Sequence, residues 1–390
     1  MNPIKSVQKH MDKLCVEIGS RHVGSPGEAA AVAYICEQFQ AGGFETVLET
    51  YPTVGWDCQS YSLIDTTANR QFSGIYPCFF SNDCDFAEEI LWLKGEALRE
   101  LEKQAVTGRL CLVEMINKPD GVFGRNAVAE RLDQLGAAAA LFISDHPVCP
   151  DTKIQRSPYL NRLATMSLAY QTAYELWPVR HHKFHLQINA RKFKHESSNV
   201  IARIIGSGSN KAVIGCHYDT APGIQGASDN ASGTAAVIEM AKLLKGRTKD
   251  WSVDFAAFGA EEYIPKDFPP GSGDYVEKHR NENIRFLLNF DSCGLCLGET
   301  TLQLGFPNKL PETTGSKHRV TEYSGAGDDK AFHAAGIPTL WYRTDSPYKN
   351  IHNATDSIEK INMELLSNII LEGKNMFEHL TNAINKEMKQ

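Results

Sequence analysis

Short apolar runs alternate with amphipathic segments over the C-terminal half of the chain. The runs have the length and composition of buried strands, and they cover residues 212–216, 253–258, 284–290 and 339–342. Apolar residues at helical spacing predict amphipathic helices over 230–245 and 363–386. Apolar strands that alternate with helices predict an α/β fold, a mostly parallel central sheet with helices on both faces.

The N-terminal segment has a different pattern. Residues 3–42 are predicted to be helical, with a break at the Gly- and Pro-containing stretch 19–26. Residues 29–39 carry apolar side chains at helical spacing, and Gly42 with Gly43 is expected to end the helix. A strand over 44–51 should follow.

The pattern of apolar and polar residues changes again between residues 66 and 195. Short β-rich runs surround one helical stretch, 126–135, and the runs are 110–115, 137–143 and 184–193. The loops are rich in Pro, Asp and Asn, and we expect no catalytic constellation in this block. We therefore expect residues 1–65 and 196–390 to form one discontinuous domain, with 66–195 as a smaller, β-rich inserted domain.

Composition and charge exclude several classes of protein. The chain has 390 residues, of which 42% are hydrophobic and 22% charged, an ordinary globular balance. A net charge of -7 without a basic patch argues against a nucleic-acid partner. No apolar run approaches the roughly 20 residues of a membrane helix, so no membrane partner is expected.

Cysteine usage predicts a reducing compartment. The N-terminus is charged and amphipathic and lacks the apolar core of a secretory signal, and ten cysteines occur without regular spacing. We therefore expect a cytoplasmic protein with reduced thiols. Cys293 and Cys296 form a CxxC pair, but no second pair stands at zinc-finger spacing.

Polar side chains gather where the predicted strands end. In open α/β sheets, ligands bind outside the carboxyl ends of the strands. Each predicted strand end, and the start of the helix at 230, presents a carboxylate, an imidazole or both. These residues are His217, Asp219, Asp229, Glu261, Glu262, Asp291, His352 and Asp356. Singly, each has a structural explanation: such histidines are often satisfied within the fold, and Asp229 could cap a helix. Their joint placement predicts a functional site.

Imidazole and carboxylate ligands suit zinc and, less selectively, manganese or cobalt. A carboxylate between two ions can bridge them, and such a pair can activate one water and polarise a carbonyl group. Of the adjacent Glu261 and Glu262, one could then bind metal while the other takes the proton of the water. Asp219 is placed to fix the orientation of the His217 ring.

Several of these segments carry a family resemblance. They are 217–219, 226–233, 259–262, 289–291, 329–332, 336–338, and His352 with Asp356. In this order the chain resembles the zinc peptidase family of bacterial leucyl aminopeptidase, aminopeptidase Y and glutamate carboxypeptidase. The resemblance is close over 196–390 and looser over the first 50 residues. Residues 66–195 look like the protease-associated domain often inserted in this family, mainly at 108–115 and 164–167.

The resemblance implies a phosphorylase/hydrolase-like zinc peptidase fold and a role for each site residue. The ligands of two zinc ions, with manganese or cobalt as possible substitutes, would be His217, Asp229, Glu262, Asp291 and His352. Asp229 would bridge the ions, Glu261 would be the general base, and Asp219 would orient His217. The implied function is that of an aminopeptidase, in which a metal-activated hydroxide attacks a peptide carbonyl and Glu261 passes the proton to the leaving amine.

Three alternatives stay open at this stage. A carboxypeptidase or dipeptidase would use the same metal centre, and Arg343 could then hold the substrate carboxylate, although it could equally be a salt-bridge partner. A non-catalytic receptor or scaffold would be expected to lose ligands, and none is missing here. A glutaminyl cyclase-like enzyme would use a single zinc ion.

The chain departs from the family pattern in two places. A longer, proline-rich stretch, 263–270, follows Glu262, and it bears on substrate preference rather than on the metal ligands. Cys293 and Cys296 follow Asp291, where we expect them to pack. Of the other histidines, His181, His182 and His185 are expected at the surface, and His333 is expected to be structural.

Overall fold

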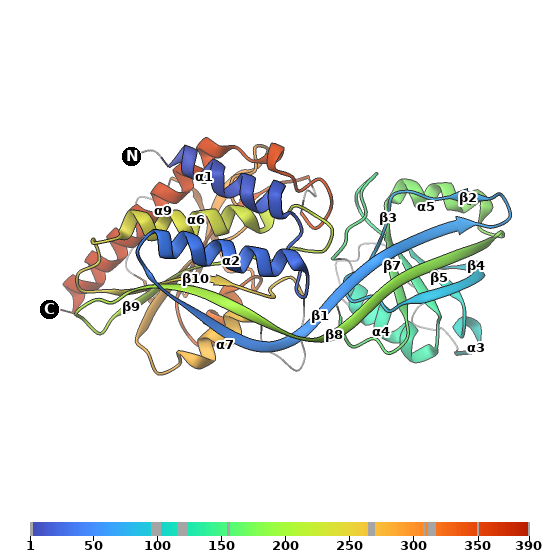
Figure 1. Ribbon diagram of the computed structural model, residues 1–390, viewed down its shortest axis with the longest axis horizontal. Coiled ribbons are helices and arrows are strands. Elements are labelled where there is room, and N and C mark those ends of the chain that lie inside the picture. Colours follow the sequence, from blue (N-terminus) through green and yellow to red (C-terminus); the bar gives the residue numbers. More distant parts are fainter. Residues whose placement is uncertain are drawn as a thin grey trace.

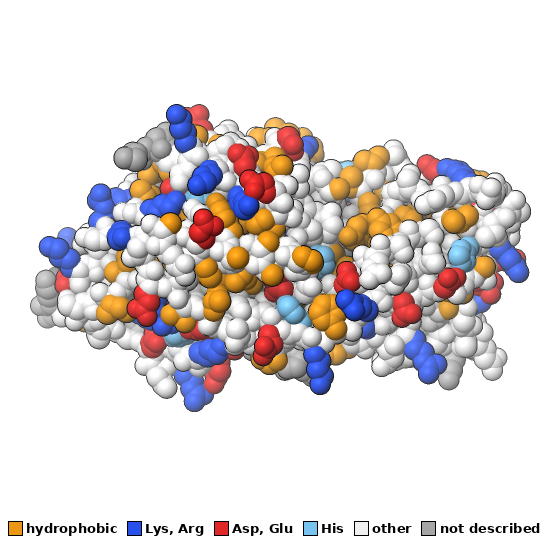
Figure 2. Space-filling model, viewed as in Figure 1, with side chains coloured by type: hydrophobic (Ala, Val, Ile, Leu, Met, Phe, Trp, Pro, Cys, Tyr) orange, Lys and Arg blue, Asp and Glu red, His pale blue; other side chains and the backbone are white. Residues whose placement is uncertain are grey.

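The computed structural model describes residues 3–94, 103–114, 124–153, 157–263, 270–306, 309–310, 317–348 and 351–388. It has two lobes joined by the long strands β1 (Glu45–Asp65) and β8 (Lys183–Ile204), and both termini lie on the larger lobe (Figure 1). On the face in Figure 2, side chains of both charges are interspersed over the two lobes. Among the described residues, no helix is both long and apolar enough to cross a membrane.

The chain begins with α1 (Ile4–Met11), a π-helical segment η1 (Asp12–Ile18) and α2 (Pro26–Ala41). The break between η1 and α2 lies where the sequence predicts it. Ser25 caps α2, because its hydroxyl accepts a hydrogen bond from the backbone N–H of Glu28 at 3.1 Å.

Four parallel strands form the centre of the sheet in the larger lobe. In spatial order they are β14 (Thr339–Asp345), β11 (Ile284–Phe290), β9 (Lys211–His217) and β10 (Ser252–Phe258). Antiparallel neighbours flank this group, with β8 beside β10 and β12 (Glu299–Gly305) beside β14. The short β13 (Arg319–Glu322) lies beyond β12. The predicted mostly parallel α/β sheet is confirmed.

Alternating side chains of these strands feed two hydrophobic clusters. Ala212 and Ile214 pack under α1, α2, α6 (Gly233–Leu244) and α9 (Met363–Glu387), which lie over one face in Figure 1. Val213, between them, points to the opposite face and packs with Tyr275 of α7 (Gly271–Lys278) and Phe332 of α8 (Asp329–Ala334). Burial of both faces explains why the strands are continuous apolar runs.

The smaller lobe has its own parallel strands, β4 to β7. They are β4 (Cys84–Lys94), β5 (Leu110–Glu114), β6 (Ala139–Ile143) and β7 (Ala164–Leu168), with β3 (Ile75–Pro77) antiparallel at the edge. Its helices are α3 (Lys103–Val106), α4 (Arg125–Leu135), α5 (Tyr170–Leu176) and the 3-10 turn η3 (Trp177–Val179). The strand predicted over 110–115 is present to residue 114, and residue 115 lies outside the described part.

Strand β1 is much longer than the predicted strand 44–51. It pairs with β8 along its length and ends beside the short β2 (Arg70–Gln71). Pro52 and Gly55 favour an earlier end in the sequence, yet both fit the strand. Pro52 is exposed, and a Cβ at Gly55 would lie 2.6 Å from the ring of Phe193. Close packing of β1 on β8 therefore requires a glycine where the sequence pattern favours a break.

Arg21 ties the N-terminal helices to the loop that follows β9. Its side chain is fully buried, and its guanidinium donates five hydrogen bonds of 2.8–3.0 Å to backbone carbonyls, those of Leu14, Gly19, Tyr218, Gln225 and Gly226. Its backbone N–H donates to the hydroxyl of Thr220 at 2.9 Å. One side chain thereby satisfies carbonyls from two segments about 200 positions apart in sequence.

We expect Arg21→Met to destabilise the protein strongly. The methionine fills similar space but leaves several buried carbonyls without donors, so the free energy of unfolding should fall by at least about 3 kcal/mol. Urea denaturation of the purified variant measures this. Arg280→Met is the matched control, because within the described part of the chain Arg280 forms only an exposed ion pair with Glu277. A similar, small effect of both substitutions would contradict this role of Arg21.

Candidate metal centre

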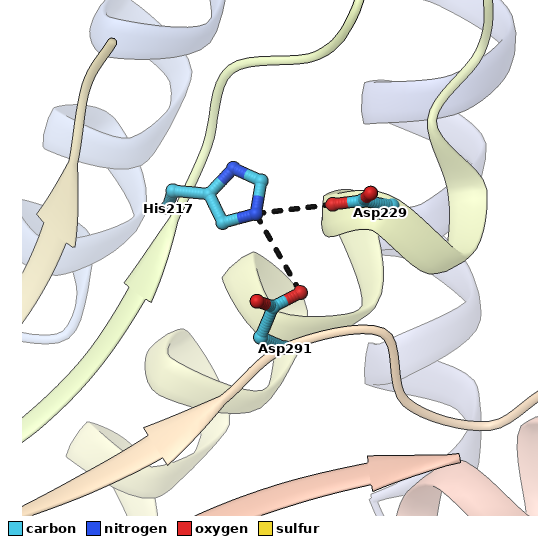
Figure 3. Close-up of side chains that lie close together, drawn as sticks. All are labelled: His217, Asp229 and Asp291. Atoms are coloured by element: carbon cyan, nitrogen blue, oxygen red, sulfur yellow. Dashed lines mark ion pairs between the residues drawn. The ribbon is translucent and has the colours of Figure 1, made fainter. Parts of the chain in front are cut away.

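Three buried side chains converge where β9 and β11 end and η4 (Ala227–Ser232) begins (Figure 3). His217 is the last residue of β9, Asp291 directly follows β11, and Asp229 belongs to η4, which precedes α6. The His217 Nε2 atom lies 3.1 Å from Asp229 Oδ1 and 3.5 Å from Asp291 Oδ1. All three side chains offer ligand atoms to a single point between them.

Asp229 also belongs to a second group of potential ligands. Its other oxygen, Oδ2, lies 3.0 Å from His352 Nε2, which in turn lies 3.7 Å from Glu262 Oε2. Within each group the ligand atoms lie within 4.8 Å of one another. One carboxylate therefore faces two sets of donors, and the structure brings together all five residues predicted to hold metal.

The surroundings of His217 fit a metal ion. Its side chain is 1% exposed, and among the described residues neither ring nitrogen has a hydrogen bond of good geometry. Buried nitrogens without hydrogen bonds are costly, and a cation bound by Nε2 and the neighbouring carboxylates removes that cost. Imidazole with carboxylates is a donor set that zinc accepts.

Electrostatics couple the imidazoles to the carboxylates. Burial alone would lower the pKa of His217, but Asp219, Asp229 and Asp291 outweigh it, so that this pKa lies well above its usual value. Burial would raise the pKa of Asp229, yet the neighbouring imidazoles of His217 and His352 hold it well below its usual value. Both pKa shifts favour protonated histidines beside ionised carboxylates.

The pKa of Glu262 is shifted in the opposite direction to that of Asp229. Burial, followed by the negative charge of Asp229, raises the pKa of Glu262 to about 7. Its side chain is 0% exposed, whereas that of Glu261 is 17% exposed. Of the two adjacent glutamates, one is therefore enclosed and the other reaches toward solvent.

Asp219 holds the turn that carries both glutamates. Its Oδ1 accepts a hydrogen bond from the backbone N–H of Glu261 and its Oδ2 one from that of Glu262, each at 3.1 Å. Oδ1 also lies 3.4 Å from Nδ1 of His217. The orientation of His217 by Asp219 stays a prediction, whereas the two hydrogen bonds of Asp219 fix the backbone after β10, which the sequence did not indicate.

Asp356 is a site residue to which the sequence assigned no role. Its carboxylate accepts hydrogen bonds from the backbone N–H groups of Ser228 at 2.7 Å and of Asp229 at 3.1 Å. Burial raises the pKa of Asp356 to about 7. The residue thus positions the backbone of Asp229, which the sequence could indicate only through its place in the family pattern.

Two more carboxylates lie at the start of α8. Asp328 and Asp329 are 0% and 1% exposed, and none of their side-chain oxygens has a hydrogen-bond partner of good geometry among the described residues. Burial, and next the charge of Asp291, raises the pKa of Asp329 to about 8. Gly327, directly before Asp328, has a φ angle of 74°, a backbone conformation that favours glycine.

Backbone strain is concentrated at the same place. Ala260, Ser292 and His352 have φ angles of 56°, 60° and 61°, which are uncommon for residues with side chains. Ala260 directly precedes Glu261, and Ser292 directly follows Asp291. Unfavourable backbone conformations therefore occur where the backbone positions the side chains of the site.

Lys153 enters the site from the smaller lobe. It lies between β6 and β7, with its Nζ atom 3.4 Å from Glu261 Oε2 and in an ion pair with Glu262. The sequence predicted no catalytic constellation in this block, and no local pattern around Lys153 indicates its place. The contact arises only from the arrangement of the two lobes.

The remaining histidines and the CxxC cysteines have other surroundings. His182 and His185 pair with separate carboxylates, those of Asp65 and Asp85, each at 2.7 Å. The ring of His333 stacks between Phe306 and Tyr323. Cys293 is buried, as expected, but Cys296 is exposed, so the expectation that it packs is wrong; both are free thiols. Residues 264–269 of the proline-rich stretch lie outside the described residues.

Arg343 lies in a cleft of about 330 Å³ that both lobes line and that the proposed ligand His352 also borders. Its Nε atom lies 2.7 Å from Asp345 Oδ1, and its guanidinium covers the ring of Trp341. The positive charge of Arg343, which a substrate carboxylate would need, is therefore already paired with Asp345.

Comparison with known proteins agrees with this geometry. Residues 199–371, which contain every metal ligand proposed above, match the sequence model of peptidase family M28. The chain is 24% identical to a probable lipoprotein aminopeptidase, LpqL, of Mycobacterium tuberculosis, over 89% of this chain and 78% of that protein. It is 30% identical to the aminopeptidase YwaD of Bacillus subtilis, over 39% of this chain and 37% of that protein.

Solved structures share the fold over nearly the whole chain. A zinc aminopeptidase from Bacillus subtilis, BSAP, superposes with a TM-score of 0.79 at 19% identity, covering 96% of this chain and 95% of that one. An aminopeptidase from Aneurinibacillus sp. strain AM-1 gives 0.72 at 19% identity, covering 97% and 94%. The resemblance to the zinc peptidase family is confirmed, whereas the protease-associated identity of residues 66–195 stays a prediction.

We expect zinc to stabilise the protein more as pH rises from about 5.5 to about 8. The pKa values of Glu262 and Asp356, about 7 in the metal-free fold, exceed those of an unfolded chain. The metal-free native state therefore binds more protons, and their contribution to stability falls as pH rises through this window. Zinc binds the deprotonated ligands. The stabilisation that zinc adds therefore increases as pH rises.

Thermal unfolding at several pH values, with and without excess zinc, measures this difference. Asp229→Asn is the control, because it removes the carboxylate that both ligand groups share and should abolish most of the zinc effect at every pH. A zinc effect independent of pH, or equal in the variant, would place the ion elsewhere.

Proposed function

We propose that this protein is a zinc aminopeptidase that uses two metal ions and Glu261 as general base. The observation that carries the proposal is the position of Asp229, whose two oxygens face separate donor groups, His217 with Asp291 and His352 with Glu262. One carboxylate between two ligand sets is what a pair of neighbouring metal ions requires.

One ion would be held by His217, Asp291 and Asp229, the other by His352, Glu262 and Asp229. Bound there, zinc would supply a Lewis acid and lower the pKa of a water molecule. The match to peptidase family M28 and the zinc aminopeptidase among the structural neighbours support this choice of metal.

The two adjacent glutamates differ in exposure, as a metal ligand and a general base should. Glu262 is enclosed, which suits a metal ligand, and Glu261 is partly exposed, which suits a residue that must meet water and substrate. Asp219 binds the backbone N–H groups of both and so fixes the Glu261 carboxylate relative to the ligands. Glu261 can then take a proton from water and return it to the leaving amine.

The charge around the site favours a substrate amine. Acidic side chains predominate here, and the buried oxygens of Asp328 and Asp329, which have no hydrogen-bond partner of good geometry among the described residues, are acceptors to which a positively charged N-terminus could donate. Arg343, the candidate for a carboxypeptidase-like site, is already paired with Asp345. The relatives named aminopeptidases support the same choice.

We expect the zinc-loaded enzyme to remove N-terminal residues only from peptides with a free N-terminus. A library in which half of the peptides are N-acetylated tests this by mass spectrometry. Glu261→Gln should lower kcat by roughly 10²- to 10⁴-fold, because the amide cannot accept the proton, while bound zinc stays at the wild-type level. Trimming of C-terminal residues regardless of acetylation would instead establish a carboxypeptidase.

We expect two zinc ions per chain in the wild type, one in His352→Ala and weaker binding of both in Asp229→Asn, because only Asp229 serves both ligand groups. Elemental analysis after equilibrium dialysis gives the stoichiometry. A single ion in the wild type would contradict the two-metal proposal.

His279→Ala is the matched control for this measurement. Asp254, His279 and Glu282 also form a group that could hold a metal ion. Lys211, however, lies 2.9 Å from Asp254 and pairs with Glu282 as well, so these carboxylates are already neutralised. The control should keep the wild-type zinc content.

A further inference from the structure

A segment of the smaller lobe is fastened directly to a metal-ligand loop. The backbone N–H and the hydroxyl of Thr152 donate to the carbonyl oxygen of His352, at 2.8 and 3.2 Å. On its other side, the carbonyl of Thr152 accepts a hydrogen bond from Phe79 at 3.1 Å. Because Thr152 is held from both sides, the next residue, Lys153, has a defined place at the site.

The Lys153 ammonium is buried among the two glutamates. Its side chain is 9% exposed, and its Nζ atom lies 3.4 Å from Glu261 Oε2 and pairs with Glu262. A buried ammonium requires anionic partners, and these two carboxylates supply them. In the metal-bound enzyme proposed above, the zinc ion would compensate the charge of Glu262. Glu261 would then remain as the anionic neighbour of Lys153.

In the proposed reaction, the position of Lys153 beside Glu261 would lie on the leaving-group side of the scissile bond. Glu261 must come within hydrogen-bond reach of the leaving nitrogen to return a proton to it. In a dipeptide, the carboxylate carbon lies only about 2.5 Å from that nitrogen, since a single Cα separates them. A cation one contact away from Glu261 is therefore within reach of the free carboxylate of a dipeptide, whereas a longer peptide presents a neutral amide there.

We propose that Lys153 is a specificity-determining residue that binds the free C-terminal carboxylate of a dipeptide, so that dipeptides are the preferred substrates. This inference rests on the proposed aminopeptidase function. It gives the smaller lobe a direct part in substrate selection, because Lys153 belongs to that lobe. An ammonium–carboxylate contact is charge-assisted and is among the stronger hydrogen bonds that a site can offer.

The test compares one dipeptide with its C-terminal amide, which has the same side chains but no charge at that end. The wild type should prefer the free acid by roughly ten- to hundredfold in kcat/KM, mostly through KM. In Lys153→Gln this ratio should fall toward one, and in Lys153→Arg, which keeps a cation, the preference should be retained. Because the measured quantity is a ratio, a general loss of stability in a variant cancels.

Lys183→Gln is the matched control, with the same change of charge on an exposed residue of the same lobe. It should keep the wild-type ratio. A binding measurement adds a readout that needs no turnover: in the Glu261→Gln background, calorimetry should show weaker binding of the free acid when Lys153 is also changed to Gln.

The outcomes separate this inference from the function on which it rests. If both substrates are cleaved in a Glu261-dependent way but the ratio is the same in wild type and Lys153→Gln, the carboxylate role is wrong and the aminopeptidase stands. If neither substrate is cleaved by the zinc-loaded wild type, the proposed function and this inference both fall.

Discussion

The buried carboxylates at the carboxyl ends of β9, β10 and β11 are the constraint on which the rest of the structure depends. Asp229 is central, because its two oxygens contact imidazoles on opposite sides. Taking several carboxylates out of water is costly unless cations and N–H donors compensate them. Near the site the chain supplies two histidines, Lys153 and the donors of its own backbone, and the proposed zinc ions would complete that compensation.

The backbone around the site is held by contacts that follow from this constraint. Asp219 and Asp356 each accept two backbone N–H groups, and in this way position Glu261 with Glu262, and Asp229. Arg21 binds the carbonyls of the same loop, so N–H donors and carbonyl acceptors are both satisfied there. Positive φ angles at Ala260 and His352 are tolerated because these surrounding contacts outweigh their cost. Ligand geometry is thus built into the fold before any metal binds.

Much of this could be predicted from the sequence, because the information is local. Buried parallel strands are apolar runs, and the residue directly after each run must lie at the carboxyl edge of the sheet, which places His217 and Asp291. The rest depends on tertiary contacts. Lys153 meets Glu261 across 108 positions, and no periodicity records such a pairing. The length of β1 was missed because Pro52 and Gly55 favour a break, whereas packing on β8 determines the outcome.

The continuous strands β1 and β8 bear on which residues around the candidate site can vary in sequence. They pair along their whole length and run through both lobes, so the smaller lobe is set relative to the metal centre by a ladder of backbone hydrogen bonds. The proposed ligands all belong to the larger lobe, where they lie at strand ends or in the segments that follow the strands, whereas Lys153 lies in a connection between two strands of the smaller lobe. Connections tolerate substitution and insertion far better than the elements they join. Substitution in this connection could therefore alter which peptide is accepted while the proposed metal ligands and the proposed general base stay in place.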